Sequence, residues 1–292
     1  MKNPAQDLLE TVYAQPVHIK SSWSIGGGCI NQTQALVLSN GETVFLKHND
    51  HPPEGMFEKE ARGLRLLREA ENGPRIPQVV AIPEGPNPKF LIIEYIEEGS
   101  SGNGYYEHFG QALASMHRTT QDHYGLDHDN FIGSTVQINT PETDGLIFFR
   151  EHRLRFQQNL ARSRGLLPVT TDNKIDQLCD QLCDQLDLSG ERPALVHGDL
   201  WSGNTFSDNA GNSCLVDPAV HFGLRETDLA MTELFGRLPQ AFYDGYRDAF
   251  PQNPGYEERK QIYNLYHLLN HLNLFGGSYL ASVESTVNTF VR

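Results

Sequence analysis

Residue types suited to phosphoryl transfer lie close together in "HGDLWSGNTF", residues 197–206, and shortly after it. Asp199 and Asn204 are five residues apart, and Asp217 follows the short apolar run "CLV". In phosphoryl transfer, one carboxylate accepts the proton of the attacking hydroxyl, while an amide oxygen and a second carboxylate hold Mg²⁺. A lone pattern of this kind is more often a turn, because Asp and Asn are turn formers. The interpretation therefore depends on companions elsewhere in the chain.

The first companion is a run of three glycines, Gly26, Gly27 and Gly28, between two stretches that read as strands. Backbone N–H groups in such a turn can point at phosphate oxygens. The turn lacks the GxxxxGK[ST] pattern and precedes a strand, so neither a P-loop nor a dinucleotide fingerprint is indicated. Alone it predicts little, since most glycine turns in hairpins bind no ligand.

Lys47 and Glu60 complete the set. Lys47 lies on the third expected strand, and Glu60 falls within the apolar stripe of the helix that follows, between Phe57 and Leu64. A carboxylate on that face needs a partner, and Lys47 is the natural one. We expect an ion pair that leaves Lys47 able to reach phosphate oxygens. Glycine turn, lysine, glutamate, Asp-x4-Asn and a final aspartate, in that order, predict a phosphotransferase.

The elements that must position these residues divide the chain near residue 97. Before it, alternating apolar runs and the turn Asn40-Gly41 predict five antiparallel strands with one helix; after it, the glycine-rich "EEGSSGNG" leads into a mainly helical pattern. We expect an α+β fold with an N-terminal lobe over 1–96 and a C-terminal lobe over 97–292. Short strands are expected at "ALV", "NTF" and "CLV", and helices over 105–118, 149–164, 174–186, 226–235 and 257–283.

The composition of the chain argues against nucleic acid as a binding partner and favours a reducing compartment. The 292 residues carry 37 acidic and 23 basic side chains, a net charge of −14, so a nucleic acid would be repelled. Four cysteines without zinc-like spacing are typical of a reducing compartment, and no stretch approaches the roughly 18 apolar residues that span a bilayer. We expect a cytoplasmic protein that binds neither nucleic acid nor membrane.

Four stretches, "GGGCIN", "FEKEARGL", "HGDLWSGN" and "DPAVHFGLRETDLAM", resemble the fructosamine kinase (ketosamine-3-kinase) family. These enzymes are related to aminoglycoside phosphotransferases and choline kinases and share a protein-kinase-like fold. The resemblance runs from about Ile25 to the C-terminal helices. It implies two lobes with ATP between them. One departure is Leu224, where many members have a histidine before Arg-Glu, and it leaves substrate preference open.

The resemblance implies a role for each matching residue. Asp228 would brace the catalytic loop and His197 would orient it through hydrogen bonds. The adenine would bind the backbone of Glu94 and Ile96, an assignment by fold analogy. The remaining roles are Asp199 as catalytic base, Asn204 and Asp217 as Mg²⁺ ligands, Lys47 with Glu60 as the contact to the α- and β-phosphates, and Gly26, Gly27 and Gly28 as the cover over the phosphates.

The implied substrate is a ketoamine, phosphorylated on the third hydroxyl of its sugar, and the implied role is deglycation. Trp201 could stack on the sugar or pack in the core, with the two readings equally weighted. Arg225, Asn270 and His271 are weaker substrate candidates. The sequence does not choose between five- and six-carbon sugars, between free and protein-bound amines, or between monomer and dimer.

The cysteines and two rival functions stay open. Cys29 beside the glycines is either an oxidation switch that blocks ATP or an inert buried thiol, and Cys179 and Cys183, one helical turn apart, look like core packing. A protein kinase is disfavoured, because Gly198 replaces the usual arginine and seven residues between Asp217 and Arg225 leave no room for an activation loop. The rivals are a kinase for an aminoglycoside or amino alcohol, and a non-catalytic nucleotide-binding redox module.

Overall fold

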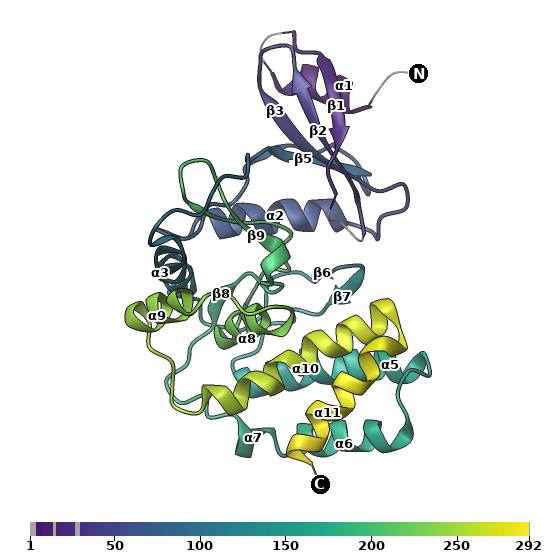
Figure 1. Cartoon of the computed structure of the whole chain (residues 1–292). Coiled ribbons are helices and arrows are strands. Elements are labelled where there is room, and N and C mark those ends of the chain that lie inside the picture. Colours follow the sequence, from purple (N-terminus) through teal and green to yellow (C-terminus); the bar gives the residue numbers. More distant parts are fainter. Residues whose placement is uncertain (1–3, 14–15, 27–29, 292) are drawn as a thin grey trace.

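The computed structural model describes residues 4–13, 16–26 and 30–291. Its N-terminal part is built on a five-stranded sheet in the order β1-β2-β3-β5-β4, with every neighbouring pair antiparallel (Figure 1). The predicted sheet and helix are therefore confirmed, although the N-terminal helix α1 was not predicted. The elements are α1 Pro4–Val12, β1 Ile19–Ser24, β2 Gln32–Leu38, β3 Thr43–His48, α2 Met56–Arg68, β4 Val79–Ala81 and β5 Phe90–Glu94.

Side chains alternate between the two faces of this sheet and meet a different helix on each. Ile92 belongs to an apolar cluster with Leu9 of α1, whereas Leu91 belongs to a cluster with Phe57 of α2. Lys47 lies opposite Leu91 in the β3–β5 ladder, so the two residues share a face. The register of the strands therefore points Lys47 toward α2, which carries Glu60.

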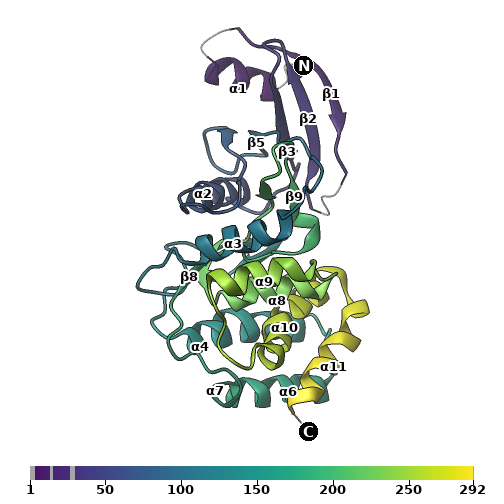
Figure 2. The same cartoon turned by 60° about the vertical axis from the view of Figure 1, so that its left-hand side comes forward.

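The C-terminal part is a body of helices below the sheet (Figure 2). Its described residues also form three two-stranded ribbons. The mixed α+β class predicted from the sequence is confirmed. No helix within the described residues has the length and apolar character that crossing a bilayer requires. The helices are α3 Tyr105–His117, α4 Gly145–Ile147, α5 Phe156–Ser163, α6 Val169–Asp180, α7 Leu182–Gln185, α8 Glu226–Leu234, α9 Gln240–Ala249, α10 Tyr256–Phe275 and α11 Leu280–Phe290.

Several of these helices differ from the predicted ones. The helix expected over 257–283 is two helices, because Gly276 adopts a φ of +83° that ends α10 and redirects the chain into α11. The helix expected over 149–164 starts earlier and includes the π-helical stretch η1, Phe148–Arg155, before α5. Helix α9 was not predicted. Cys179 is buried as expected, but Cys183 is exposed, because α6 ends at Asp180 and the backbone of Gln181 departs from helical geometry before α7 begins.

The ribbons bring the polar loops of the site together. Each is antiparallel, and Val216 after β10 donates its N–H to the carbonyl of Asn204 at 3.1 Å. Of the three strands predicted here, all are present, whereas β6, β7 and β11 were not predicted. The pairs are β6 Asn130–Ile132 with β7 Thr135–Gln137, β8 Ala194–Val196 with β11 His221–Gly223, and β9 Thr205–Ser207 with β10 Ser213–Leu215.

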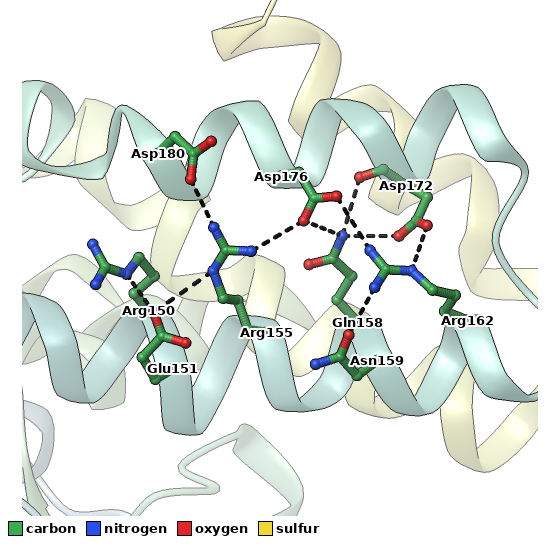
Figure 3. A network of polar contacts seen from close by, with 9 residues as sticks. All are labelled: Arg150, Glu151, Arg155, Gln158, Asn159, Arg162, Asp172, Asp176 and Asp180. Carbon is green, nitrogen blue, oxygen red and sulfur yellow. Dashed lines mark hydrogen bonds and ion pairs between the residues drawn. The ribbon is translucent and has the colours of Figure 1, made fainter.

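An ionic ladder joins η1 and α5 to α6 (Figure 3). Arg155 contacts Asp176 at 3.2 Å and Asp180 at 2.7 Å, and Arg162 contacts Asp172 at 2.6 Å and Asp176 at 3.2 Å. These side chains lie at or near the surface, and each of the two arginines bridges two aspartates of α6. The ladder aligns two antiparallel helices and lies away from the polar loops.

Arg75 links the sheet to the β9–β10 ribbon. Its guanidinium contacts the carboxylates of Glu94 on β5 and of the buried Asp208, each at 2.5 Å. The backbone N–H of Arg75 donates to the carbonyl of Ser213 at 2.7 Å. Asp208 in turn accepts the backbone N–H groups of the tight turn that joins the two strands. One arginine thus ties the end of β5 to the hairpin that starts beside Asn204.

Candidate active site

A cavity of about 200 Å³ brings the predicted phosphotransferase residues together. Its walls come from the sheet, α2, the β6–β7 ribbon, the loop after β8 and the end of α10, elements that lie around the same region in Figure 1. Residues far apart in the sequence therefore share one site. The predicted residues in its lining are Lys47, Glu60, Asp199, Trp201, Asn204, Asp217, Asn270 and His271.

Lys47 is the centre of the charged end of this cavity. Its side chain is 5% exposed, its Nζ pairs with Oε1 of Glu60, and it lies 2.8 Å from Oδ1 of Asp217. Burial alone would lower the pKa of Lys47, but the charges of Asp217 and Glu60 raise it above its usual value, so the ammonium stays charged. Two carboxylates face one lysine, which leaves negative charge that a cation could neutralise.

Asp217 is held in a conformation that few residues adopt. Its φ is +55°, in the left-handed region, and Pro218 follows it. Hydrogen bonds on both sides fix this turn, because Val216 donates to Asn204 and Ala219 donates to His197 at 2.8 Å. A strained residue held this firmly is typical of functional sites. Its carboxylate is directed at Lys47 and the cavity.

Asn204 and Asp199 form a second polar pair. Nδ2 of Asn204 donates to the carbonyl of Asp199 at 2.9 Å and to its Oδ2 at 3.3 Å. Because Nδ2 is used in this way, Oδ1 of Asn204 is the atom that could bind a cation. Carboxylate and amide oxygens are ligands that Mg²⁺ prefers, so Asn204 and Asp217 fit that ion.

The Asp199 carboxyl has the acidity of a general base. Burial and then the charge of Asp217 raise its pKa to about 7, while the hydrogen bond from Asn204 opposes the shift. A pKa near the working pH favours proton transfer in both directions. Asp199 could therefore accept a proton from a hydroxyl placed in the cavity.

Asp228 braces the loop that carries Asp199, as the sequence predicted. Its two oxygens accept the N–H groups of His197 at 2.7 Å and Gly198 at 2.9 Å, and Nε2 of His117 lies 3.2 Å away. Burial alone would raise the pKa of Asp228, but the contact with His117 holds it below its usual range. The ionised carboxylate therefore fixes the loop by its backbone.

Two further residues explain the conformation of this loop. Gly198 has a φ of +82°, and a Cβ there would collide with the carbonyl oxygen of Ala219, so the arginine of regulated protein kinases would not fit. Nε2 of His197 donates to the carbonyl of Val216 at 2.9 Å, and its Nδ1 accepts the N–H of Asp199 at 3.3 Å. Burial lowers the pKa of His197, which keeps the ring neutral in this orienting role.

Three of the four predicted substrate-binding residues line the cavity and one does not. Trp201, Asn270 and His271 line the cavity, and Asn270 accepts a hydrogen bond from Gln157 at 3.2 Å. Arg225 lies elsewhere: it is buried, and its guanidinium binds both carboxylate oxygens of Glu191 at 2.9 Å. Arg225 is therefore not among the described lining residues of this cavity, and the structure gives its substrate role no support.

The structure describes only some of the residues predicted to bind ATP. Gly26 lies at the end of the described segment 16–26, and a Cβ there would meet open space. Gly27, Gly28 and Cys29 lie outside the described residues, so the phosphate cover and the redox switch stay predictions. Glu94 and Ile96 are not among the described cavity-lining residues, and Glu94 donates its N–H to the carbonyl of Gln78.

Several residues that line the cavity were not predicted from the sequence. Lys59 of α2 stands 4.7 Å from the ring centre of Phe131 on β6, and both line the cavity with Leu274 and Phe275 of α10. Strand β6 is too short for an alternating pattern to reveal it. The Gly-Gly pair after Phe275 is the one signal that could have marked a helix end at the site.

The relatives of the chain identify its family. The family model of fructosamine kinase matches residues 1–292. A protein of Synechocystis sp. assigned as a ketoamine kinase is 40% identical over 296 residues, which cover 99% of this chain and 96% of the relative. The chain belongs to the fructosamine kinase family and is a kinase of that family.

Solved structures agree with this assignment. A crystal structure from Thermobifida fusca, assigned as a fructosamine-3-kinase, has a TM-score of 0.87 at 30% identity and covers 99% of this chain and 98% of that chain. An aminoglycoside phosphotransferase in a ternary complex with AMP-PNP and hygromycin B has a TM-score of 0.62 at 15% identity, covering 98% and 99%. The second likeness shows the fold alone.

Proposed function

We propose that the protein transfers the γ-phosphate of ATP, with Mg²⁺, to the third hydroxyl of the sugar of a ketosamine, and so acts in deglycation. The observation that carries this proposal is the single cavity shared by Lys47, Asp199, Asn204 and Asp217. These four are the groups that phosphoryl transfer needs, and the kinase family supplies the substrate class.

We assign residues 1–96 to an ATP-binding lobe and residues 97–292 to a catalytic and substrate-binding lobe. In this assignment the adenine binds the backbone of Glu94 and Ile96, and the glycines at 26–28 cover the phosphates. Lys47, held by Glu60, contacts the α- and β-phosphates. Its ion pair keeps Nζ in place and charged, which supports this role.

The proton and the phosphoryl group move in one step between neighbouring groups. Asp199 accepts the proton of the sugar hydroxyl, whose oxygen forms the bond to the γ-phosphorus as the bond to ADP breaks. Mg²⁺, held by Asn204 and Asp217, would neutralise the charge on the phosphates. Asp228 keeps Asp199 in position throughout, because it binds the loop by two N–H groups.

Two rivals remain testable. An aminoglycoside or amino-alcohol kinase would share the fold, but the kinases named for ketoamines are much closer in sequence. A non-catalytic redox module would be expected to lack the base, the lysine or a metal ligand, and all of these are present.

We also propose that the protein is located in the cytoplasm.

The test is a kinase assay over ribulosamine, erythrulosamine, fructosamine, an aminoglycoside and choline. Phosphate transfer to one or more ketosamines, with none to the aminoglycoside or choline, is the expected result. Transfer only to the aminoglycoside or choline would replace the proposal with the first rival. ATP binding with no transfer to any of the five would favour the second.

A further inference from the structure

The cavity has two ends of different chemistry. Among the described lining residues the carboxylates are Glu60 and Asp217, which contact Lys47, and Asp199, which contacts Asn204. Away from them the wall is made of ring and aliphatic side chains from the loop after β8 and the end of α10. We call the following cluster of rings the aromatic end: Trp201, His271 and Phe275, which line the cavity, with Phe235 and Tyr279 behind them.

The rings of the aromatic end hold one another in place. Ring centres lie 6.5 Å apart for Trp201 and Phe235, 4.7 Å for Phe235 and His271, 5.5 Å for His271 and Phe275, and 5.0 Å for His271 and Tyr279. These separations are those of favourable aromatic pairs. The surface is therefore preformed, and a ligand would not have to order it.

The chain is folded specifically to make this surface. Helix α10 ends at Phe275, and Gly276, with its φ of +83°, turns the chain so that Tyr279 returns onto His271 and Phe275. Phe235 arrives from the end of α8. Three separate segments thus contribute rings to one side of the cavity.

The outermost ring of the aromatic end is half exposed. Phe275 is 48% exposed, and it does not stand alone, because it continues the contacting rings of His271 and Tyr279. The exposed part of Phe275 borders the cavity that also contains Asp199. Water is the poorer partner for such a surface, so an apolar group of a ligand would be bound there.

We propose that the aromatic end binds the substituent on the amine nitrogen of the ketosamine, and that this substituent is hydrocarbon, an alkyl chain or an aryl ring. The inference rests on the proposed function, because it assumes that the sugar hydroxyl lies at Asp199. With the sugar there, the amine half extends past Trp201, two residues along the chain, toward His271 and Phe275.

The charges around the aromatic end agree with this occupant. Burial lowers the pKa of His271, so its ring is neutral and does not repel the ammonium of a ketosamine. The rings themselves attract a cation over their faces. The lysines among the described lining residues are engaged elsewhere: Lys47 contacts Glu60 and Asp217, and Lys59 stands over Phe131 on the β6 wall. A polar substituent on the nitrogen would gain little from the rings.

The test compares two ketosamines of one sugar, made from benzylamine and from ethanolamine. The wild-type enzyme is expected to show a KM roughly tenfold lower for the benzylamine compound at a similar kcat. Phe275→Ala should reduce this ratio toward one without changing the KM for ATP. Val169→Ala, which removes a 75% exposed apolar side chain on α6, is the matched control and should keep the wild-type ratio.

A second measurement does not depend on the folding of Phe275→Ala. In a Trp23→Phe variant, Trp201 is the remaining tryptophan, and the benzylamine compound should change its fluorescence without ATP. Equal KM values for the two compounds, an unchanged ratio in Phe275→Ala, or a silent Trp201 would overturn the inference while leaving the kinase proposal standing. Absence of phosphate transfer to either compound would overturn both.

Discussion

Two ionic networks in this molecule both pair basic with acidic side chains, but in different surroundings. In the ladder between α5 and α6, Arg162 is 45% exposed and Asp180 71% exposed (Figure 3). In the site, Lys47 is 5% exposed, Glu60 12% exposed and Asp217 46% exposed. The ladder spreads three arginines and four carboxylates along two helices, whereas the site places two carboxylates on one buried lysine.

The difference separates structure from function. Exposed ion pairs contribute about 0–1 kcal/mol each, because water and salt screen them. Burying a charged cluster costs free energy unless further groups balance it, so a buried cluster with an excess of negative charge marks a place where a ligand is expected. Both networks carry one more carboxylate than cations, so the burial of Lys47 is what distinguishes the site from the ladder.

Asp199→Asn should have the largest effect on function. The variant keeps the shape of the side chain but cannot accept the hydroxyl proton, so kcat should fall between about 10²- and 10⁴-fold. ATP binding measured by calorimetry should persist. Asp248→Asn, at an exposed position on α9, is the control and should keep full turnover. Turnover retained in Asp199→Asn would remove Asp199 as the base.

Lys47→Met tests the buried network for stability and function together. It leaves Glu60 and Asp217 without their partner, so the free energy of unfolding should fall by about 3 kcal/mol and turnover should be lost. Adding Glu60→Gln should restore part of the stability and none of the turnover. Lys20→Met, an exposed lysine on β1, is the control in denaturant titrations. Turnover recovered in the double variant would contradict the role given to Lys47.

Asp208→Asn tests the link between sheet and ribbon through pH. Burial alone would raise the pKa of Asp208, but hydrogen bonds from Asn212 and the contact with Arg75 lower it to about 2. Its folded pKa lies below the unfolded value of about 3.9, so its contribution to stability is present above pH 4 and lost toward pH 2. The variant should lose stability less steeply over that range. Parallel curves for wild type and variant would contradict this.

Arg162→Ala should have the smallest effect. The ladder is exposed, so the free energy of unfolding should change by less than about 1 kcal/mol, and kcat should not change. Thermal and denaturant unfolding would measure the first and a kinase assay the second. A loss of several kcal/mol would show that the ladder stabilises the fold more than its exposure suggests.

The sequence was a good guide where local patterns decide. Alternating apolar residues and Asn40-Gly41 predicted the sheet, and the apolar stripe around Glu60 predicted its pairing with Lys47. The bracing role of Asp228 also matches its contacts. For the sheet and the ion pair the signal lies within a few residues or in the need of a buried charge for a partner, whereas the role of Asp228 came from the family resemblance.

The sequence was a poor guide where long-range packing decides. Nothing near Arg225 indicates that Glu191, 34 residues away, binds its guanidinium. The break at Gly276 was read as part of one helix, because an isolated glycine pair is tolerated in a helical pattern. The exposed ring of Phe275 beside the site follows from that break, so the aromatic end could not be predicted.

The position of the transferred phosphate is the most direct test of the proposed function. The product of wild-type enzyme, ATP, Mg²⁺ and a ketosamine would be analysed by phosphorus and carbon NMR, beside Asp199→Asn under the same conditions. We predict phosphate on the third carbon of the sugar, formed by the wild type and nearly absent with the variant. Phosphate on another oxygen, or equal product from both proteins, would contradict the proposal.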